Sequence, residues 1–268
     1  MKKLKLLDTF AGIGGFSYAA ENLVGGFKTV QFIEIDPYCQ QILNKNFPNI
    51  PIHDDITTYR AKPYSADVIS AGFPCTDISV AGRGEGIKET TRSGLFFQLI
   101  TTIRMVRPKY IILENVSAIL NNGMDIVLGE LYKAGFDAEW CCIPSSFVGA
   151  CHQRDRFWLI AFSSDSKSSH WNGDETQQRN GKTRTQEISR DRNSSRSSQV
   201  WKITEHRLNP NWRRYVSQPT ICRGDDGLST KLDAEQRIQR LKMLGNSVVP
   251  QVCAIPLQRV IQLEREQQ

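Results

Sequence analysis

Four reactive side chains stand at separate points of the chain, each beside an apolar run. Cys75 follows a proline, Glu114 precedes an asparagine, and Arg154 and Arg156 flank an aspartate. A thiolate is a nucleophile, and a carboxyl group kept protonated in a partly dry site can donate to a ring nitrogen. Paired guanidinium groups suit a phosphate or a base carbonyl. These residue types predict a nucleophile that works beside an acid.

Each of these residues also has an ordinary structural interpretation. A lone cysteine such as Cys75 is more often structural than reactive. Glu114 with Asn115 could cap a helix, and Arg154 and Arg156 could be exposed charges that alternate on one face of a strand. The position of Cys75 favours chemistry, because it follows an expected strand on a polar loop rich in glycine, long enough to act as a lid.

A second group of residues predicts an adenosine cofactor. The stretch Asp8–Phe16 reads as a strand, a glycine turn and a helix start, and Glu34 ends the next strand about twenty residues later. Such an acid can accept hydrogen bonds from ribose hydroxyls. Asp36 is expected to cap the following helix, and Asp55 either contacts the adenine edge or forms a turn. A tight turn without a ligand stays open, and the pattern does not separate NAD from S-adenosylmethionine.

The elements that position these residues alternate along residues 1–162. Apolar runs predict strands at Leu4–Asp8, Thr29–Ile35, Asp67–Ala71, Tyr110–Glu114, Glu139–Ile143 and Phe157–Phe162. Helical patterns lie at Phe16–Val24, Pro37–Phe47, Leu95–Val106 and Met124–Ala134. Strand and helix in alternation predict an α/β fold with a doubly wound, mostly parallel, Rossmann-like sheet.

Composition limits the alternatives. The chain has 268 residues, 40% of them hydrophobic, and no apolar run of eighteen that would predict a membrane span. Its seven cysteines include no CxxC spacing, so neither a disulfide framework nor a zinc site is expected, and a reducing compartment is. The net charge of +6 permits a nucleic-acid partner without demanding one.

The positive charge is concentrated after the expected sheet. Residues 163–217 hold eleven Lys and Arg against six Asp and Glu, and residues 164–199 contain few large apolar side chains. We expect 164–199 to be disordered alone and to order against DNA, with base-specific contacts from 200–230. A solvated insertion without a role is the alternative.

The last segment predicts a helix from Gly245 onward. Asn246 or Ser247 is expected to cap it, and Pro256 to kink it. The expected division is a catalytic and cofactor-binding domain at 1–162, a partly disordered target-recognition region at 163–235, and a C-terminal helix at 236–268 that returns to the catalytic domain.

The motifs in order resemble the DNA (cytosine-5) methyltransferase family, in particular its compact bacterial and phage-type enzymes. The stretches that carry the resemblance are DTFAGIGGFS, FIEID, GFPCTDIS, ENV, QRDRFW and GNSVVPQV, from Asp8 to about Val252. The family usually has Pro-Gln before its double-arginine motif, where this chain has Cys151-His152. The region that varies in the family falls at about 163–215.

The resemblance implies a role for each matching residue. Cys75 would be the nucleophile, Glu114 would protonate or hydrogen-bond cytosine N3, and Arg154 and Arg156 would hold the flipped-out base and its neighbouring charge. The residues that would hold S-adenosylmethionine are Phe10, Gly12, Gly14, Gly15, Glu34, Ile35, Asp55, Ile56 and Asn246. No metal is implied.

The resemblance therefore implies methyl transfer from S-adenosylmethionine to C5 of a cytosine in a specific sequence of double-stranded DNA. It also implies a cytoplasmic monomer, with any cognate restriction endonuclease acting as a separate protein. A tRNA cytosine-5 methyltransferase shares these motifs and remains the alternative. A nicotinamide oxidoreductase would need a hydride-handling residue, and a catalytically silent homologue is disfavoured because Cys75, Glu114 and both arginines are present.

Overall fold

A computed structural model of the chain describes residues 2–74, 87, 94–150, 152–163, 239 and 243–267. Cys75, the loop that follows it and the expected recognition region at 163–235 lie almost wholly outside these residues. The expectations for 164–199 and 200–230 therefore lie outside the described residues as well.

Seven strands form one sheet in the described part of the chain, in the order β3-β2-β1-β4-β5-β7-β6. The strands are β1 (Leu4–Thr9), β2 (Phe27–Ile33), β3 (Ile52–His53), β4 (Val68–Ala71), β5 (Tyr110–Val116), β6 (Phe136–Pro144) and β7 (Asp155–Ser163). β1 to β5 pair in parallel, whereas β7 runs antiparallel to both of its neighbours, β5 and β6. This confirms the predicted mostly parallel α/β sheet.

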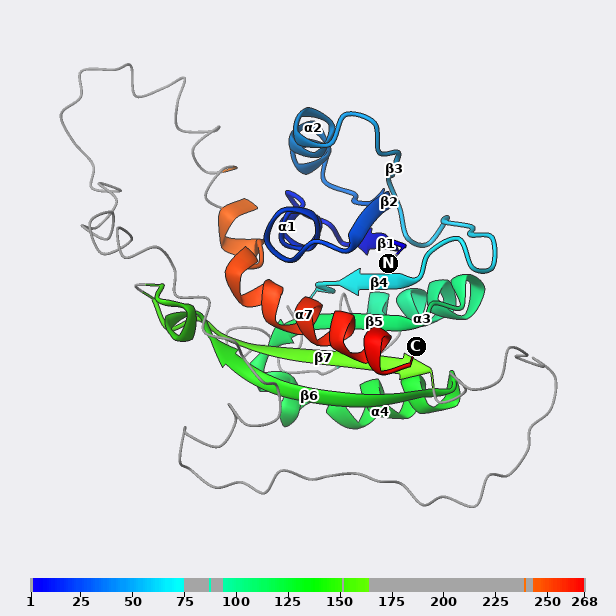
Figure 1. The fold of residues 1–268 in the computed structure, drawn as a ribbon, viewed down its shortest axis with the longest axis vertical. Helices are drawn as coiled ribbons and strands as arrows, with labels where there is room; N and C mark the ends of the chain where they lie inside the picture. The colour runs from blue at the N-terminus through cyan, green and yellow to red at the C-terminus, as the bar shows by residue number, and fades with distance from the viewer. Residues whose placement is uncertain are drawn as a thin grey trace.

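Helices cover both faces of the sheet. One face packs against α3 (Leu95–Val106) and α4 (Met124–Lys133), and alternate side chains of β1, β4 and β5 fill the core between them. The other face packs against α1 (Gly15–Tyr18), its continuation η1 (Ala19–Val24), and α7 (Pro250–Glu266). Figure 1 shows α7 lying along β5 and β7. Side chains alternate between the two faces along each strand, and helices cover both faces. The sheet is therefore buried on both sides, as a doubly wound fold requires.

The first helix and the second strand differ from the expectation, whereas the cap of the second helix does not. The helix expected at Phe16–Val24 begins at Gly15 and becomes a π-helix from Ala19. β2 ends at Ile33, where its pairing with β1 and β3 stops, so Glu34 and Ile35 follow the strand instead of ending it. Asp36 caps α2 (Pro37–Asn46) by accepting a hydrogen bond from the Tyr38 amide at 2.9 Å, as expected.

The cap expected for the C-terminal helix was wrong. α7 begins at Pro250, its N-cap is Val249, and neither Asn246 nor Ser247 caps it. Pro250 is the first residue of the helix, where its missing N–H group leaves one fewer amide without a partner. The helix runs through Pro256, which is buried. None of the described helices is long and apolar enough to cross a membrane.

Candidate active site at the carboxyl edge of the sheet

Glu114 lies near the end of β5, in a buried position at the carboxyl edge of the parallel strands. The Nε atom of Arg156 approaches its Oε1 atom to 2.9 Å. Burial raises the pKa of Glu114, while the charges of Arg156 and Arg154 oppose that rise. The effect of desolvation on the pKa is larger than the opposing effect of the two arginines. The Glu114 carboxyl therefore holds its proton more readily in this site than it would in water. Glu114 lies within a strand, which excludes the helix-cap alternative.

The peptide that leads to Cys75 packs directly against this carboxyl. A Cβ atom at Gly72 would lie 3.4 Å from Oε2 of Glu114, which is van der Waals contact, so the chain just after β4 lies beside the acid. Asn115 is also buried, and its Nδ2 donates to the Phe73 carbonyl oxygen at 3.2 Å. Cys75 itself lies outside the described residues. The structure therefore brings Gly72 and Phe73 to Glu114 and Asn115.

The two arginines bond to different parts of the site. Arg156 lies in β7 and pairs with Glu114. Arg154 precedes β7 with a positive φ of 36°, and its Nη2 atom donates to the carbonyl oxygens of Gly245 and Ser247 at 2.8 and 2.9 Å. The turn at Arg154 sends the side chain toward the segment that precedes α7.

The glycine turn after β1 and the acid after β2 form one hydrogen-bonded unit. Gly12 donates its amide to Oε2 of Glu34 at 2.7 Å, and the amide of Asp36 donates to Oε1 at 2.8 Å. Glu34 is buried, and this burial raises its pKa although the backbone donors oppose the shift. Phe10 and Gly14 have positive φ values, 53° and 86°, so the chain turns sharply on both sides of Gly12.

The glycine turn at 10–14 and the segment Glu34–Asp36 together form a corner, called here the Glu34 corner. The chemistry of its surface fits an adenosine group. Each carboxylate oxygen of Glu34 has lone pairs beyond the one that its amide donor uses, so both can accept from ribose hydroxyls. Nothing lies within 4 Å of a Cβ atom built at Gly12, and the side chain of Ile35 is 70% exposed beside the acid. An acceptor pair, an open space and an apolar surface together suit a nucleoside.

The remaining predicted cofactor residues lie around the same edge. Asp55 accepts the amide of Thr57 at 2.8 Å and so forms a turn, as its structural interpretation required, and Ile56 is buried. Asn246 is exposed in a helical turn at 243–246, just before Ser247. Gly15 begins α1, and a Cβ atom there would lie 2.7 Å from Cγ2 of Val248.

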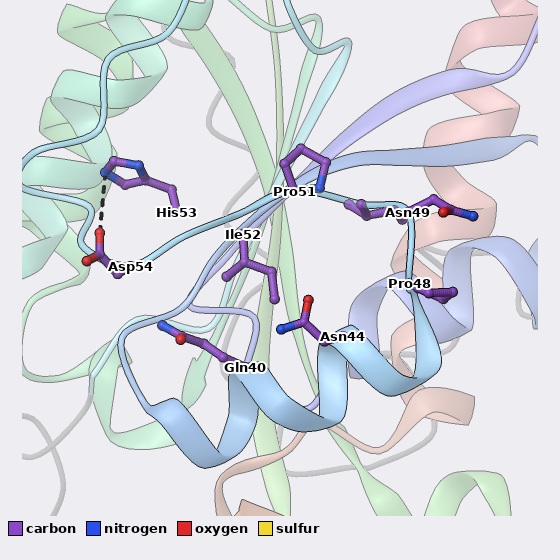
Figure 2. Close-up of a pocket in the computed structure, with 9 residues that line it drawn as sticks. Gln40, Asn44, Pro48, Asn49, Pro51, Ile52, His53 and Asp54 are labelled. Atoms are coloured by element: carbon purple, nitrogen blue, oxygen red, sulfur yellow. Dashed lines mark ion pairs between the residues drawn. The ribbon is translucent and has the colours of Figure 1, made fainter.

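A separate open hollow of about 740 Å³ lies between α2 and the segment 48–54. Figure 2 shows Gln40, Asn44 and Pro48–Asp54 around it, with His53 and Asp54 3.9 Å apart. Gln40 lines the hollow and also contacts the Glu34 corner, because its Nε2 donates to the Glu34 carbonyl oxygen at 2.6 Å. Among the described residues that line the hollow, none is a predicted catalytic residue.

Sequence reasoning missed a buried carboxyl beneath the site. Asp8 in β1 is fully buried and accepts hydrogen bonds from the hydroxyls of Ser17 and Ser70 at 2.7 and 2.8 Å. Burial raises its pKa to about 7. The available signal was a carboxylate that directly follows the apolar pair Leu6-Leu7 in a strand, and a buried carboxylate needs partners from elsewhere in the fold. Among the described residues, no group of three His, Cys, Asp or Glu is placed to hold a metal ion.

Comparison with known proteins finds similarity to type II methyltransferases. The type II methyltransferase M.CviJI of Paramecium bursaria Chlorella virus IL3A is 33% identical over 164 residues, which cover 60% of this chain and 44% of that protein. The type II methyltransferase M2.BsuMI of Bacillus subtilis (strain 168) is 36% identical over 166 residues, or 59% of this chain and 42% of that protein. The match thus spans less than half the length of either relative.

The fold is also found among solved structures. The Dnmt2 methyltransferase of S. pombe superposes with a TM-score of 0.51 at 22% identity, over 63% of this chain and 52% of that chain. The family model for C-5 cytosine-specific DNA methylases matches residues 4–221. Because that match covers most of the chain, this protein belongs to the C-5 cytosine-specific DNA methylase family.

Proposed function

We propose that this protein transfers a methyl group from S-adenosylmethionine to C5 of a flipped-out cytosine in a specific sequence of double-stranded DNA. The observation that carries the proposal is the buried Glu114, which pairs with Arg156 and packs against the peptide that leads to Cys75. An acid and the approach to a nucleophile meet there, at the sheet edge that also holds the Glu34 corner. Family membership supports the same chemistry.

Cys75 acts as the nucleophile in this proposal. Its thiolate forms a bond to C6 of the base, and the electron pair of the C5–C6 double bond moves into the ring toward N3. Glu114 gives N3 a proton or a strong hydrogen bond, which removes the charge that the addition creates. Arg156 holds the Glu114 carboxyl in place. A base inside a stacked duplex is out of reach, so it must flip out, at a cost of about a few kcal/mol.

Residues around the Glu34 corner would hold the cofactor. Glu34 would accept from the ribose hydroxyls, Ile35 and Ile56 would contact the adenine, and Asp55 would face its edge. Phe10, the turn Gly12–Gly15 and Asn246 would enclose the rest. When bound, S-adenosylmethionine supplies the sulfonium methyl group that the activated C5 takes up. The C5 proton then leaves to water, the bond between Cys75 and C6 breaks, and N3 returns its proton.

The rest of the chain has proposed roles outside the described residues. Residues 163–235 would recognise the target sequence, and their positive charge would contact DNA phosphates. The division at 1–162, 163–235 and 236–268 remains part of the proposal. The enzyme would act on duplex DNA as a monomer, with any cognate endonuclease a separate protein.

The test supplies labelled S-adenosylmethionine with either random duplex DNA or tRNA and locates modified cytosines by bisulfite sequencing. We expect label in DNA at one sequence, and a covalent adduct with DNA that contains 5-fluorocytosine, because fluorine cannot leave as a proton. Cys75→Ser should abolish both while cofactor binding survives. Label in tRNA alone would establish the tRNA alternative, and the absence of an adduct under turnover conditions would overturn the covalent mechanism.

A further inference from the structure

The peptide at 154–156 contacts two different parts of the site. Arg156 pairs with Glu114 on the side of the expected base, whereas Arg154 donates to the carbonyl oxygens of Gly245 and Ser247. Both bonds of Arg154 come from a single nitrogen, Nη2, at 2.8 and 2.9 Å. Charged hydrogen bonds of this kind are stronger than neutral ones. A side chain that directly precedes β7 therefore holds the segment just before α7.

The backbone at Arg154 is strained in a way that directs this contact. Its φ of 36° lies in the left-handed region, which costs a non-glycine residue free energy unless its surroundings hold it there. They do so on both sides, because the Ser145 amide donates to the Gln153 carbonyl at 2.7 Å and β7 begins at Asp155. Strain at a held position indicates that the direction of the Arg154 side chain matters.

The segment that Arg154 holds packs closely against the start of α1. A Cβ atom at Gly15 would lie 2.7 Å from Cγ2 of Val248 and 3.2 Å from Oγ of Ser247. Real Cβ atoms essentially never approach so closely, so only glycine at position 15 allows this packing. The glycine turn is thus enclosed between its own sheet edge and the segment 245–248.

The same turn also binds Glu34, the acid that follows β2. Gly12 donates its amide to Glu34 at 2.7 Å, and Gly14 precedes Gly15 directly. A continuous set of contacts therefore runs from Arg154 through residues 245–248 and Gly15 to Glu34. Asn246, which is expected to contact the cofactor, lies between the two residues whose carbonyl oxygens Arg154 binds.

We propose that Arg154 is a positioning residue for the cofactor site, which it builds by holding residues 245–248 against the glycine turn. The inference rests on the proposed function, and it gives Arg154 a role other than the base contact that the family resemblance implies. The same peptide then orients the acid through Arg156 and shapes the Glu34 corner through Arg154. Loss of Arg154 should weaken S-adenosylmethionine binding more than DNA binding.

The test compares Arg154→Met, Arg154→Lys and the wild type, with Arg104→Met as a matched control. Arg104 lies on the outer side of α3 and pairs with Glu130 at 3.1 Å, so its loss should leave activity unchanged. Methionine keeps most of the apolar stem and removes the donors. Lysine can donate two bonds from one nitrogen, as Nη2 of Arg154 does, and should restore part of the binding.

Two measurements are needed. In the free protein, hydrogen exchange of the amides at 247–253 should speed up in Arg154→Met and not in Arg104→Met. By calorimetry, the Kd for S-adenosylmethionine should rise roughly 10- to 100-fold in Arg154→Met, the range that loss of a charged hydrogen-bonding group produces. The KM for DNA at saturating cofactor should change little.

The outcomes separate this inference from the proposed function. Wild-type protein that neither binds S-adenosylmethionine nor methylates cytosine would refute the proposed function, and the exchange experiment would still report whether Arg154 holds the segment. If the wild type is active while Arg154→Met keeps its cofactor affinity and loses DNA affinity, Arg154 contacts the substrate and the inference is wrong. Unchanged hydrogen exchange in Arg154→Met would overturn it equally.

Discussion

The Nε atom of Arg156 lies 2.9 Å from Oε1 of Glu114, and this ion pair joins β7 to β5 at the carboxyl edge of the sheet. Both side chains are mostly shielded from water, with 23% of the arginine and 11% of the glutamate exposed. In such a setting the pair orients the carboxyl group, and its contribution to folding is smaller than its geometry implies. Its main consequence is a fixed acid beside the peptide that leads to Cys75.

Glu114→Gln should slow methyl transfer while leaving cofactor binding intact. The amide keeps the size of the side chain but cannot release a proton to N3, so we expect a loss of roughly 100- to 10,000-fold in the single-turnover rate. Quenched-flow methylation at saturating S-adenosylmethionine measures this rate. Glu130→Gln, on α4 away from the site, is the control. A rate within a few-fold of the wild type would show that Glu114 is not the acid.

Arg156→Met should destabilise the protein in a pH-dependent way. Arg156 lowers the pKa of Glu114 against the effect of burial, so its removal raises that folded-state pKa further. A group whose folded pKa is raised destabilises the protein as pH rises through that value, because the native state must then hold an unpaired buried charge. We expect a loss of about 3 kcal/mol near pH 8 that shrinks near pH 5. Urea unfolding at both pH values measures it, and equal losses would contradict this account.

Asp8→Asn should flatten the dependence of stability on pH. The pKa of Asp8 is raised from 3.8 to about 7 by burial, so the folded protein binds a proton that the unfolded chain releases. Its stabilising contribution is full below about pH 4 and is lost as pH rises toward 7, a change of roughly 4 kcal/mol at about 1.4 kcal/mol per pH unit.

Asparagine at position 8 has the size of aspartate and no charge, and rotation of the Ser17 or Ser70 hydroxyl can accommodate its amide donor. Unfolding free energies between pH 4 and pH 8 should therefore fall with pH less steeply than in the wild type. Asp137→Asn changes an exposed carboxyl in β6 and should keep the wild-type slope. An unchanged slope in Asp8→Asn would mean that Asp8 stays ionised throughout.

Glu34→Ala should weaken S-adenosylmethionine binding by about 1–3 kcal/mol, since it removes charge-assisted acceptors from the ribose hydroxyls. It also leaves the amides of Gly12 and Asp36 without their acceptor, which would loosen the turn. Glu34→Gln separates the two effects, because its carbonyl oxygen still accepts one amide. Calorimetric titration of both variants provides the measurement. Wild-type affinity in Glu34→Ala would exclude a ribose contact.

Much of the architecture was predictable from the sequence alone. Short apolar runs alternate with amphipathic stretches, and this pattern predicts a mostly parallel sheet because helices that connect parallel strands cover both faces of the sheet. Local residue chemistry also predicted Asp36 as a helix cap and the glycine turn after β1, because a cap and a turn depend on neighbours in the chain. The order of the motifs along the chain likewise predicted the family.

Only the tertiary structure decided which of these residues meet. The sequence predicted a strand after Arg154, but its direction depends on pairing with β5, and only the antiparallel arrangement brings Arg156 to the same edge as Glu114. The same holds for Arg154 and the segment before α7, which are about ninety residues apart in sequence. Asp8 and Asn115 find their partners on other strands too. The periodicity of the sequence indicates which faces of an element are buried. The order and direction of the strands depend on the packing of the whole chain, and strand order and direction determine which side chains share a site.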